Sequence, residues 1–183
     1  MHSPRQSVVR TGIATGVLAV AVVLGGCTPG PAPTPTPTPL FTSEAEAFKA
    51  AEAVYREYTD AGNASRNGDS SAAPDKYLAG SALEDDIKAR RDIKAAGLTV
   101  SGSLVVQSFS GTKYDPRGGS VAAIVCLGVG DTRVMNKDGQ DVTPVGRPKV
   151  SAVAVEFARA NKGAALMITR SESSSETCAA SGS

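Results

Sequence analysis

The sequence predicts an α+β fold, because two kinds of hydrophobic periodicity occupy separate parts of the chain. Before Gly97, apolar residues recur every three or four positions, which is typical of helices packed along one face. After Gly97 they alternate every second residue, as in strands. Helices followed by a run of long antiparallel strands form an α+β domain, with helices on one face of the sheet. The expected strands are 98–113, 121–129, 150–159 and 165–173.

The first helix is expected over residues 44–60. Ser43 stands at a suitable N-cap position and Glu46 follows three residues later, which together form a capping box. A stripe that includes Tyr55 and Tyr58 then recurs at helical spacing, and the helix should end before the next glycine. The two tyrosines would line a ligand cavity or pack in the core, and the pattern favours the core.

A second helical region is expected between Pro74 and Gly97. Pro74 can open a short turn, Ser81 and Glu84 form another capping box, and Gly97 suits the end of the helix. The acidic run 84–86 would then lie in the first turn, where the helix dipole favours carboxylates. The alternative is a carboxylate site, but catalytic carboxylates need opposed placement across a cleft. A solvated helix start is therefore the favoured interpretation.

The strand region contains its own breaks and one segment of central-strand character. Gly102 and Gly111 are expected to mark a bend or bulge and the end of the first strand. Residues 121–129 are apolar on both alternating faces, as in a central strand or a dimer interface. Turns are expected at 115–119, 136–139 and 161–163.

The N-terminus has the three parts of an export signal. Arg5 and Arg10 precede an apolar run over residues 12–24, which is shorter than the ~20 residues that span a bilayer. Leu24-Gly25-Gly26-Cys27 follows and resembles the bacterial lipobox, in which the cysteine receives a diacylglycerol and becomes the first mature residue. The resemblance implies a signal peptide over residues 1–26 and a lipidated Cys27 that holds the protein on the cell membrane. An ordinary secretory leader is the alternative.

Composition limits what the mature chain can do. Residues 27–40 are rich in proline and threonine, which predicts an extended, disordered linker after the lipidated cysteine. Removal of the two leader arginines leaves 17 basic residues against 18 acidic ones, so no basic field for nucleic acid is expected. The chain's one histidine, His2, leaves with the leader. We therefore predict no metal site, no cofactor and no histidine-activated nucleophile.

Two further cysteines lie in the folded part of the chain. If Cys27 carries the lipid, Cys126 and Cys178 remain as an even pair in an exported protein. Oxidising surroundings favour a disulfide between them. Two separately buried thiols are the alternative.

The order of helices, then four bent strands with one cysteine in the second strand and another after the last, resembles actinobacterial lipoproteins of the nuclear transport factor two-like superfamily. This resemblance implies an α+β cone over residues 41–178, in which a curved antiparallel sheet wraps helices around a pocket. Residues 179–183 would be a disordered tail.

Three functions fit these features. The first is a non-catalytic binding or interaction module at the extracytoplasmic face of the cell membrane, acting on an envelope protein or small ligand. The second, implied by the superfamily, is a pocket enzyme such as an isomerase, cyclase or dehydratase for a small apolar molecule. Its candidate residues are Tyr55, Tyr58 and Asp60, since an Asp and Tyr pair can move a proton. The third is a scaffolding module. The sequence leaves the oligomeric state open.

Overall fold

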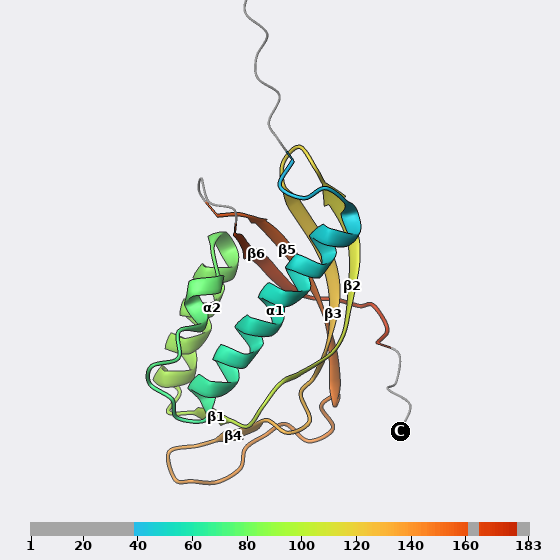
Figure 1. Cartoon of the computed structure of the whole chain (residues 1–183). Helices are drawn as coiled ribbons and strands as arrows, with labels where there is room; N and C mark the ends of the chain where they lie inside the picture. The colour runs from blue at the N-terminus through green and yellow to red at the C-terminus, as the bar shows by residue number, and fades with distance from the viewer. Residues whose placement is uncertain (1–38, 161–164, 179–183) are drawn as a thin grey trace, which may run out of the picture. The chain divides into compact units, whose positions relative to one another are not determined.

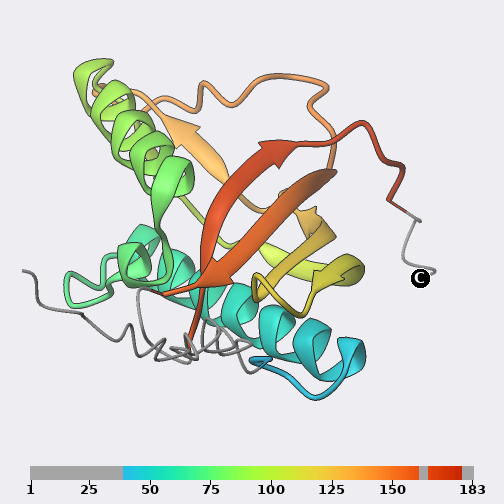
Figure 2. The same cartoon turned by 90° about the horizontal axis from the view of Figure 1, so that it is seen from above.

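Two helices lie on one face of a four-stranded antiparallel sheet in the computed structural model, which describes residues 39–160 and 165–178 (Figure 1, Figure 2). This arrangement confirms the predicted α+β class. The described residues belong to one compact unit. In chain order the elements are α1 (Glu44–Arg66), the 3₁₀ helix η1 (Pro74–Tyr77), α2 (Gly80–Ala95), β1 (Thr99–Ser101), β2 (Val105–Asp115), β3 (Ser120–Gly128), β4 (Arg133–Met135), β5 (Val150–Arg159) and β6 (Leu166–Ser173).

Helix α1 begins where the sequence predicts and ends later. The Ser43 Oγ accepts a hydrogen bond from the Glu46 backbone N–H at 3.2 Å, which confirms the N-cap. The Glu46 carboxylate accepts from the backbone N–H and hydroxyl of Thr42, one residue before the cap. The predicted end near residue 60 is wrong. The helix continues because Asn63, in the added turn, exchanges two hydrogen bonds with the backbone of Leu104.

Helix α2 begins before the predicted capping box. The Ala79 backbone N–H donates to the Ile168 carbonyl in β6 at 2.8 Å, which holds the helix start against the sheet. The Ser81 hydroxyl donates to the Thr169 carbonyl at 3.2 Å instead of capping the helix. The capping box at Ser81 is therefore wrong, and so is the placement of the acidic run 84–86 in the first turn, which holds no acid.

The end of α2 follows the predicted glycine signal. Gly97 has a φ of +66°, the left-handed conformation that glycine adopts without strain. The Gly97 and Leu98 backbone N–H groups donate to the carbonyls of Lys94 and Ile93, at 3.1 and 3.0 Å. These two bonds make a Schellman motif, which satisfies the last carbonyls of the helix and turns the chain towards β1.

The sheet is ordered β2-β3-β5-β6, so β3 is a central strand as predicted. The expected single strand over 98–113 is instead divided into β1 and β2. Gly102 causes the break: its φ is +86°, and a Cβ there would lie 2.2 Å from the Asp131 carbonyl oxygen. Strand β1 pairs with β4 in a separate two-stranded sheet. Gly111 does not end its strand but lies at a bulge within β2.

The core lies between α1 and the sheet face that the helices cover. Ala47, Ala51 and Tyr55 form the buried stripe of α1, spaced four residues apart. Alternate residues of β3, from Val121 to Leu127, point to the same core, and Phe157 of β5 is fully buried. Bulges in β2 and β6 accompany the bending of the long strands visible in Figure 2.

Two of the predicted turns are present, and several other predicted segments lie outside the residues that the structure describes. The Asp115 side chain accepts from the backbone N–H groups of Arg117 and Gly118, and the Asn136 side chain accepts from those of Asp138 and Gln140. The predicted turn at 161–163, the leader, most of the linker and the tail at 179–183 lie outside the described residues.

Candidate functional site

A groove of about 530 Å³ lies between the C-terminal half of α1, helix α2 and the segment that leads into β1. We call it the α1–α2 groove. Its volume falls within the range of about 300–1,000 Å³ that is usual for small-molecule sites. Its charged lining is Arg66, Asp86, Arg90 and Lys94, its apolar lining is Ala89, Ile93, Leu98 and Val100, and Gly62, Ser65 and Thr99 complete it.

Helical spacing places the α2 residues on the groove. Counted from Asp86, the other lining residues of α2 follow after three, four, seven and eight positions, which puts all five on one face of the helix. They are Ala89, Arg90, Ile93 and Lys94. The Schellman turn at the end of α2 then brings the next segment back along the helix. The groove is therefore built by one helix face and the chain reversal that follows it.

Arg66 joins the groove to the loop between β1 and β2. Its Nε donates to the Gly102 carbonyl at 3.4 Å, and one terminal nitrogen donates to the Asn63 Oδ1 at 2.5 Å. Burial lowers the pKa of Arg66, with a smaller opposing effect of Tyr58. The guanidinium remains charged, because arginine titrates far above neutral pH. It is a fixed, half-buried positive charge at the edge of the groove.

Asp86 is the acidic member of the groove. An Arg90 terminal nitrogen lies 2.7 Å from its Oδ2, with side chains 52% and 24% exposed, respectively. That Oδ2 atom is buried and has no hydrogen-bond partner of good geometry, so the contact with Arg90 is electrostatic. Asp86 also acts on Tyr58, whose pKa is raised first by burial and then by this carboxylate. A polar cluster of Tyr58, Asp86, Arg66 and Arg90 thus lies where the two helices face each other.

The residues predicted to share a pocket do not line this groove. Tyr55 is buried in the core, with its ring centroid 5.9 Å from that of Tyr58 and 6.4 Å from that of Phe157. Burial also raises the pKa of Tyr55. Asp60 is exposed and lines a separate depression beside Thr59. The grouping of Tyr55, Tyr58 and Asp60 is corrected, because a five-residue step on a helix turns Asp60 away from Tyr55.

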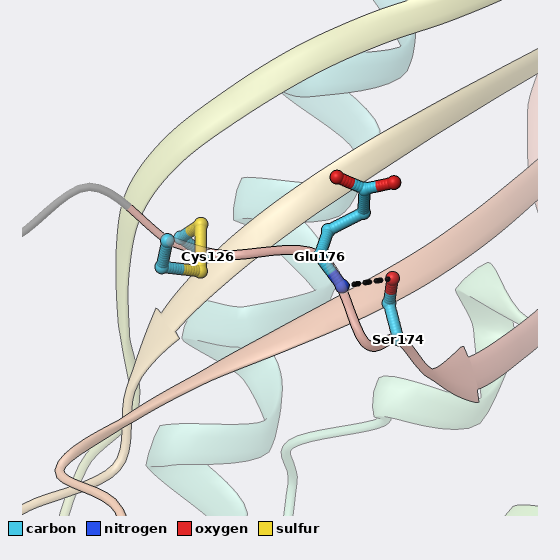
Figure 3. Close-up of a disulfide and its surroundings, with 4 residues drawn as sticks. Cys126, Ser174 and Glu176 are labelled. Carbon is cyan, nitrogen blue, oxygen red and sulfur yellow. Dashed lines mark hydrogen bonds between the residues drawn. A yellow bond between two sulfur atoms is a disulfide. The ribbon is translucent and has the colours of Figure 1, made fainter.

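The structure joins Cys126 and Cys178 in a disulfide, with Cα atoms 5.7 Å apart. Cys126 lies on β3, and Cys178 lies in the segment that follows β6. Figure 3 shows this segment leading to the bridge past Glu176, whose backbone N–H donates to the Ser174 Oγ. The predicted pairing is confirmed, and the alternative of two separate thiols is not. Cys27 lies outside the described residues.

The described residues contain neither a metal-binding cluster nor a membrane-spanning helix. Within residues 39–160 and 165–178, no cluster of three or more His, Cys, Asp or Glu side chains is arranged to hold a metal ion. Among the helices in those same ranges, none combines the length and hydrophobicity needed to cross a membrane.

Comparisons with known proteins do not assign this chain to a family. No family model matches the sequence, and no curated protein matches it. Among solved structures, the intermembrane space region of the chloroplast protein ARC6 is similar to this chain, with a TM-score of 0.46 at 14% identity. The match covers 69% of this chain and 95% of the other.

Sequence reasoning missed the groove but had a signal for it. The spacing of Asp86, Arg90 and Lys94 places them on one helix face, but the acidic run by itself favours a solvated helix start. Glu84 and Asp85 are indeed exposed, whereas Asp86 is half-buried. The contribution of Arg66 depends on the added turn of α1, which no residue pattern indicated.

Proposed function

We propose that this protein is a lipoprotein anchored through Cys27 on the extracytoplasmic face of the cell membrane, with an α+β domain that serves as a non-catalytic binding module. The observation that carries the proposal is the use of the three cysteines. Two of them form the Cys126–Cys178 disulfide, and the third is the cysteine of the lipobox-like leader. A disulfide is typical of an oxidising compartment, which is the environment that an exported lipoprotein enters.

The α1–α2 groove supports binding as the role of the domain. It combines an apolar lining with four charged side chains, which is the composition usual for ligand sites. The mature chain has no imidazole, and Tyr55 is committed to the core. Beside the groove, Tyr58 is affected by the charges of Asp86, Arg66 and Arg90. This arrangement favours holding a ligand over moving a proton.

The anchor is tested by the intact mass of the protein purified from its native membrane, with a count of free thiols. We expect a lipid-sized mass increase on the N-terminal fragment, and no free thiol. Cys27→Ser should abolish the added mass and release the protein from the membrane. Cys178→Ser is the matched control, because it removes a cysteine and should keep the lipid. An unmodified Cys27 in the native protein would refute the anchor.

Binding is tested separately by photo-crosslinking in intact cells. A photoreactive residue at Ser65, which lines the groove, should capture a small molecule or an envelope protein. The same residue at Glu176, which is exposed in the segment before the disulfide, is the control position. Equal labelling at both positions, or none at Ser65, would count against the groove as the binding site.

A further inference from the structure

The α1–α2 groove has an excess of positive charge, although the mature chain as a whole is close to neutral. Arg66, Arg90 and Lys94 line it, and Asp86 is the acid among its lining residues. The ion pair between Asp86 and Arg90 leaves Arg66 and Lys94 without a carboxylate partner within the part of the chain that the structure describes. A local excess of cations on a neutral protein favours an anionic ligand.

Arg66 is positioned so that part of its guanidinium stays available. The protein uses its Nε and one terminal nitrogen, and these bonds fix the plane of the group. The other terminal nitrogen lies over Gly62, where an added Cβ would be 3.3 Å away. A side chain at position 62 would therefore crowd this guanidinium, which would have to shift by a few tenths of an ångström. Among the described residues, that nitrogen has no hydrogen-bond acceptor.

The remaining lining selects for more than charge. Ile93, Leu98 and Val100 are half-buried hydrophobic residues beside the cations, and Ala89 leaves room between them. An inorganic anion would leave this surface in water, and a neutral amphiphile would leave the cations without a partner. A ligand with both an anionic head and an apolar chain satisfies both parts of the groove.

We propose that the groove binds a small amphipathic anion, with a phosphate or carboxylate head on Arg66, Arg90 and Lys94 and an alkyl chain on Ile93, Leu98 and Val100. This inference rests on the proposed binding function and names the class of ligand. Phosphate and carboxylate share the chemistry that these cations recognise, because both present negatively charged oxygens that accept charge-assisted hydrogen bonds from guanidinium and ammonium groups.

The test is isothermal titration of residues 27–183 with Cys27→Ser, a chain that contains the whole compact unit. Octyl phosphate is the probe, with inorganic phosphate and octyl glucoside as its two halves. All are used below the concentration at which the amphiphiles form micelles. We expect octyl phosphate to bind at least about tenfold more tightly than either half, because it uses both the apolar and the charged lining. Equal affinity for octyl phosphate and octyl glucoside would overturn the proposal, as would equal affinity for inorganic phosphate.

Variants then assign the head group to its residues. Arg90→Gln and Lys94→Gln should each weaken octyl phosphate binding by about tenfold or less, and the double variant should weaken it further. Neither substitution should change the binding of octyl glucoside. Arg91→Gln is the matched control, because Arg91 is exposed beside Arg90 and does not line the groove. Ala89→Leu should block both amphiphiles by filling the groove. An Arg91→Gln effect as large as that of Arg90→Gln would refute the assignment.

The result separates this inference from the proposed function. Crosslinking at Ser65 in cells without octyl phosphate binding overturns the ligand class and leaves the binding module standing. Capture of a protein at Ser65 with no competition by octyl phosphate also overturns the ligand class. Binding of octyl phosphate that Ala89→Leu abolishes, together with capture at Ser65 that octyl phosphate competes away, supports both.

Discussion

Removing the Cys126–Cys178 bridge is expected to destabilise the domain by a definite amount that the structure allows us to estimate. The bridge closes a sequence separation of 52 residues. In the chain-entropy description, that loop costs the unfolded chain about 4 kcal/mol of conformational freedom. The bridge therefore stabilises the folded state chiefly by limiting the unfolded one.

Without the bridge, the folded state also gains conformational entropy, and this gain reduces the loss of unfolding free energy. The segment after β6 is held as far as Ser174, whose backbone N–H donates to the Ala152 carbonyl at 3.0 Å. Cys178 is only four positions after Ser174, and the same expression gives about 2 kcal/mol for a loop of about that length. The expected net loss on removing the bridge is therefore about 2 kcal/mol.

Urea denaturation of residues 27–183 with Cys27→Ser, followed by circular dichroism, measures this difference. Cys178→Ser should lower the free energy of unfolding by about 2 kcal/mol and leave β3 unaltered. Reduction with a dithiol should produce the same loss in the parent and none in Cys178→Ser. A loss near 4 kcal/mol would show that the segment after Ser174 keeps its path without the bridge. A loss near zero would refute the entropic argument itself.

Three further perturbations test the packing and the buried phenols. Gly111→Ala is expected to cost about 1–3 kcal/mol of unfolding free energy, because a Cβ there would lie 2.3 Å from the Phe48 ring. Phe157→Ala is expected to cost about 3–5 kcal/mol in the same denaturation assay, because its ring is fully buried. Tyr55 and Tyr58 should ionise only at unusually high pH, since burial raises the pKa of both phenols. The folded protein then keeps protons that the unfolded chain releases, so stability should fall as pH rises above about 10. Phenolate absorbance and urea denaturation across alkaline pH check this.

A control or a contradicting result is defined for each of these perturbations. Gly130→Ala should be close to neutral, because the nearest atom to its added Cβ is 3.8 Å away. A Gly130→Ala loss equal to that of Gly111→Ala would contradict the steric argument. Tyr55→Phe and Tyr58→Phe should each remove one late-titrating phenol. Alkaline titration that is unchanged in both variants would contradict the burial of these groups. A loss below about 2 kcal/mol for Phe157→Ala would contradict its place in the core.

The sequence predicts the fold best where one local rule decides the structure. Strand β5 occupies the predicted residues 150–159, because alternating apolar residues lie between clear turn signals. The end of α2 follows from Gly97, which needs no tertiary partner. The end of α1 was predicted too early, because the added turn depends on hydrogen bonds between Asn63 and Leu104, 41 positions away. Ser81 was misassigned for the same reason, since its partner Thr169 belongs to β6.

The candidate site was less predictable than the fold. The sequence correctly favours Tyr55 and Tyr58 as packing residues. The structure does not place them in one pocket with Asp60, because Asp60 projects from a different face of the same helix. The groove requires α2 to lie beside the last turn of α1, which is a tertiary relation without a sequence signature. Periodicity therefore indicates which residues share a helix face but not which face meets another element.

The position of the groove along α1 bears on the kind of ligand that can reach it. The linker joins the domain at residue 41, beside the start of α1, whereas Gly62 and Arg66 line the groove near its end. At about 1.5 Å of rise per residue, these two ends of the helix lie roughly 30 Å apart. The groove therefore lies about one helix length from the residue at which the chain enters the domain, where a monomeric amphipathic anion can reach it from solution.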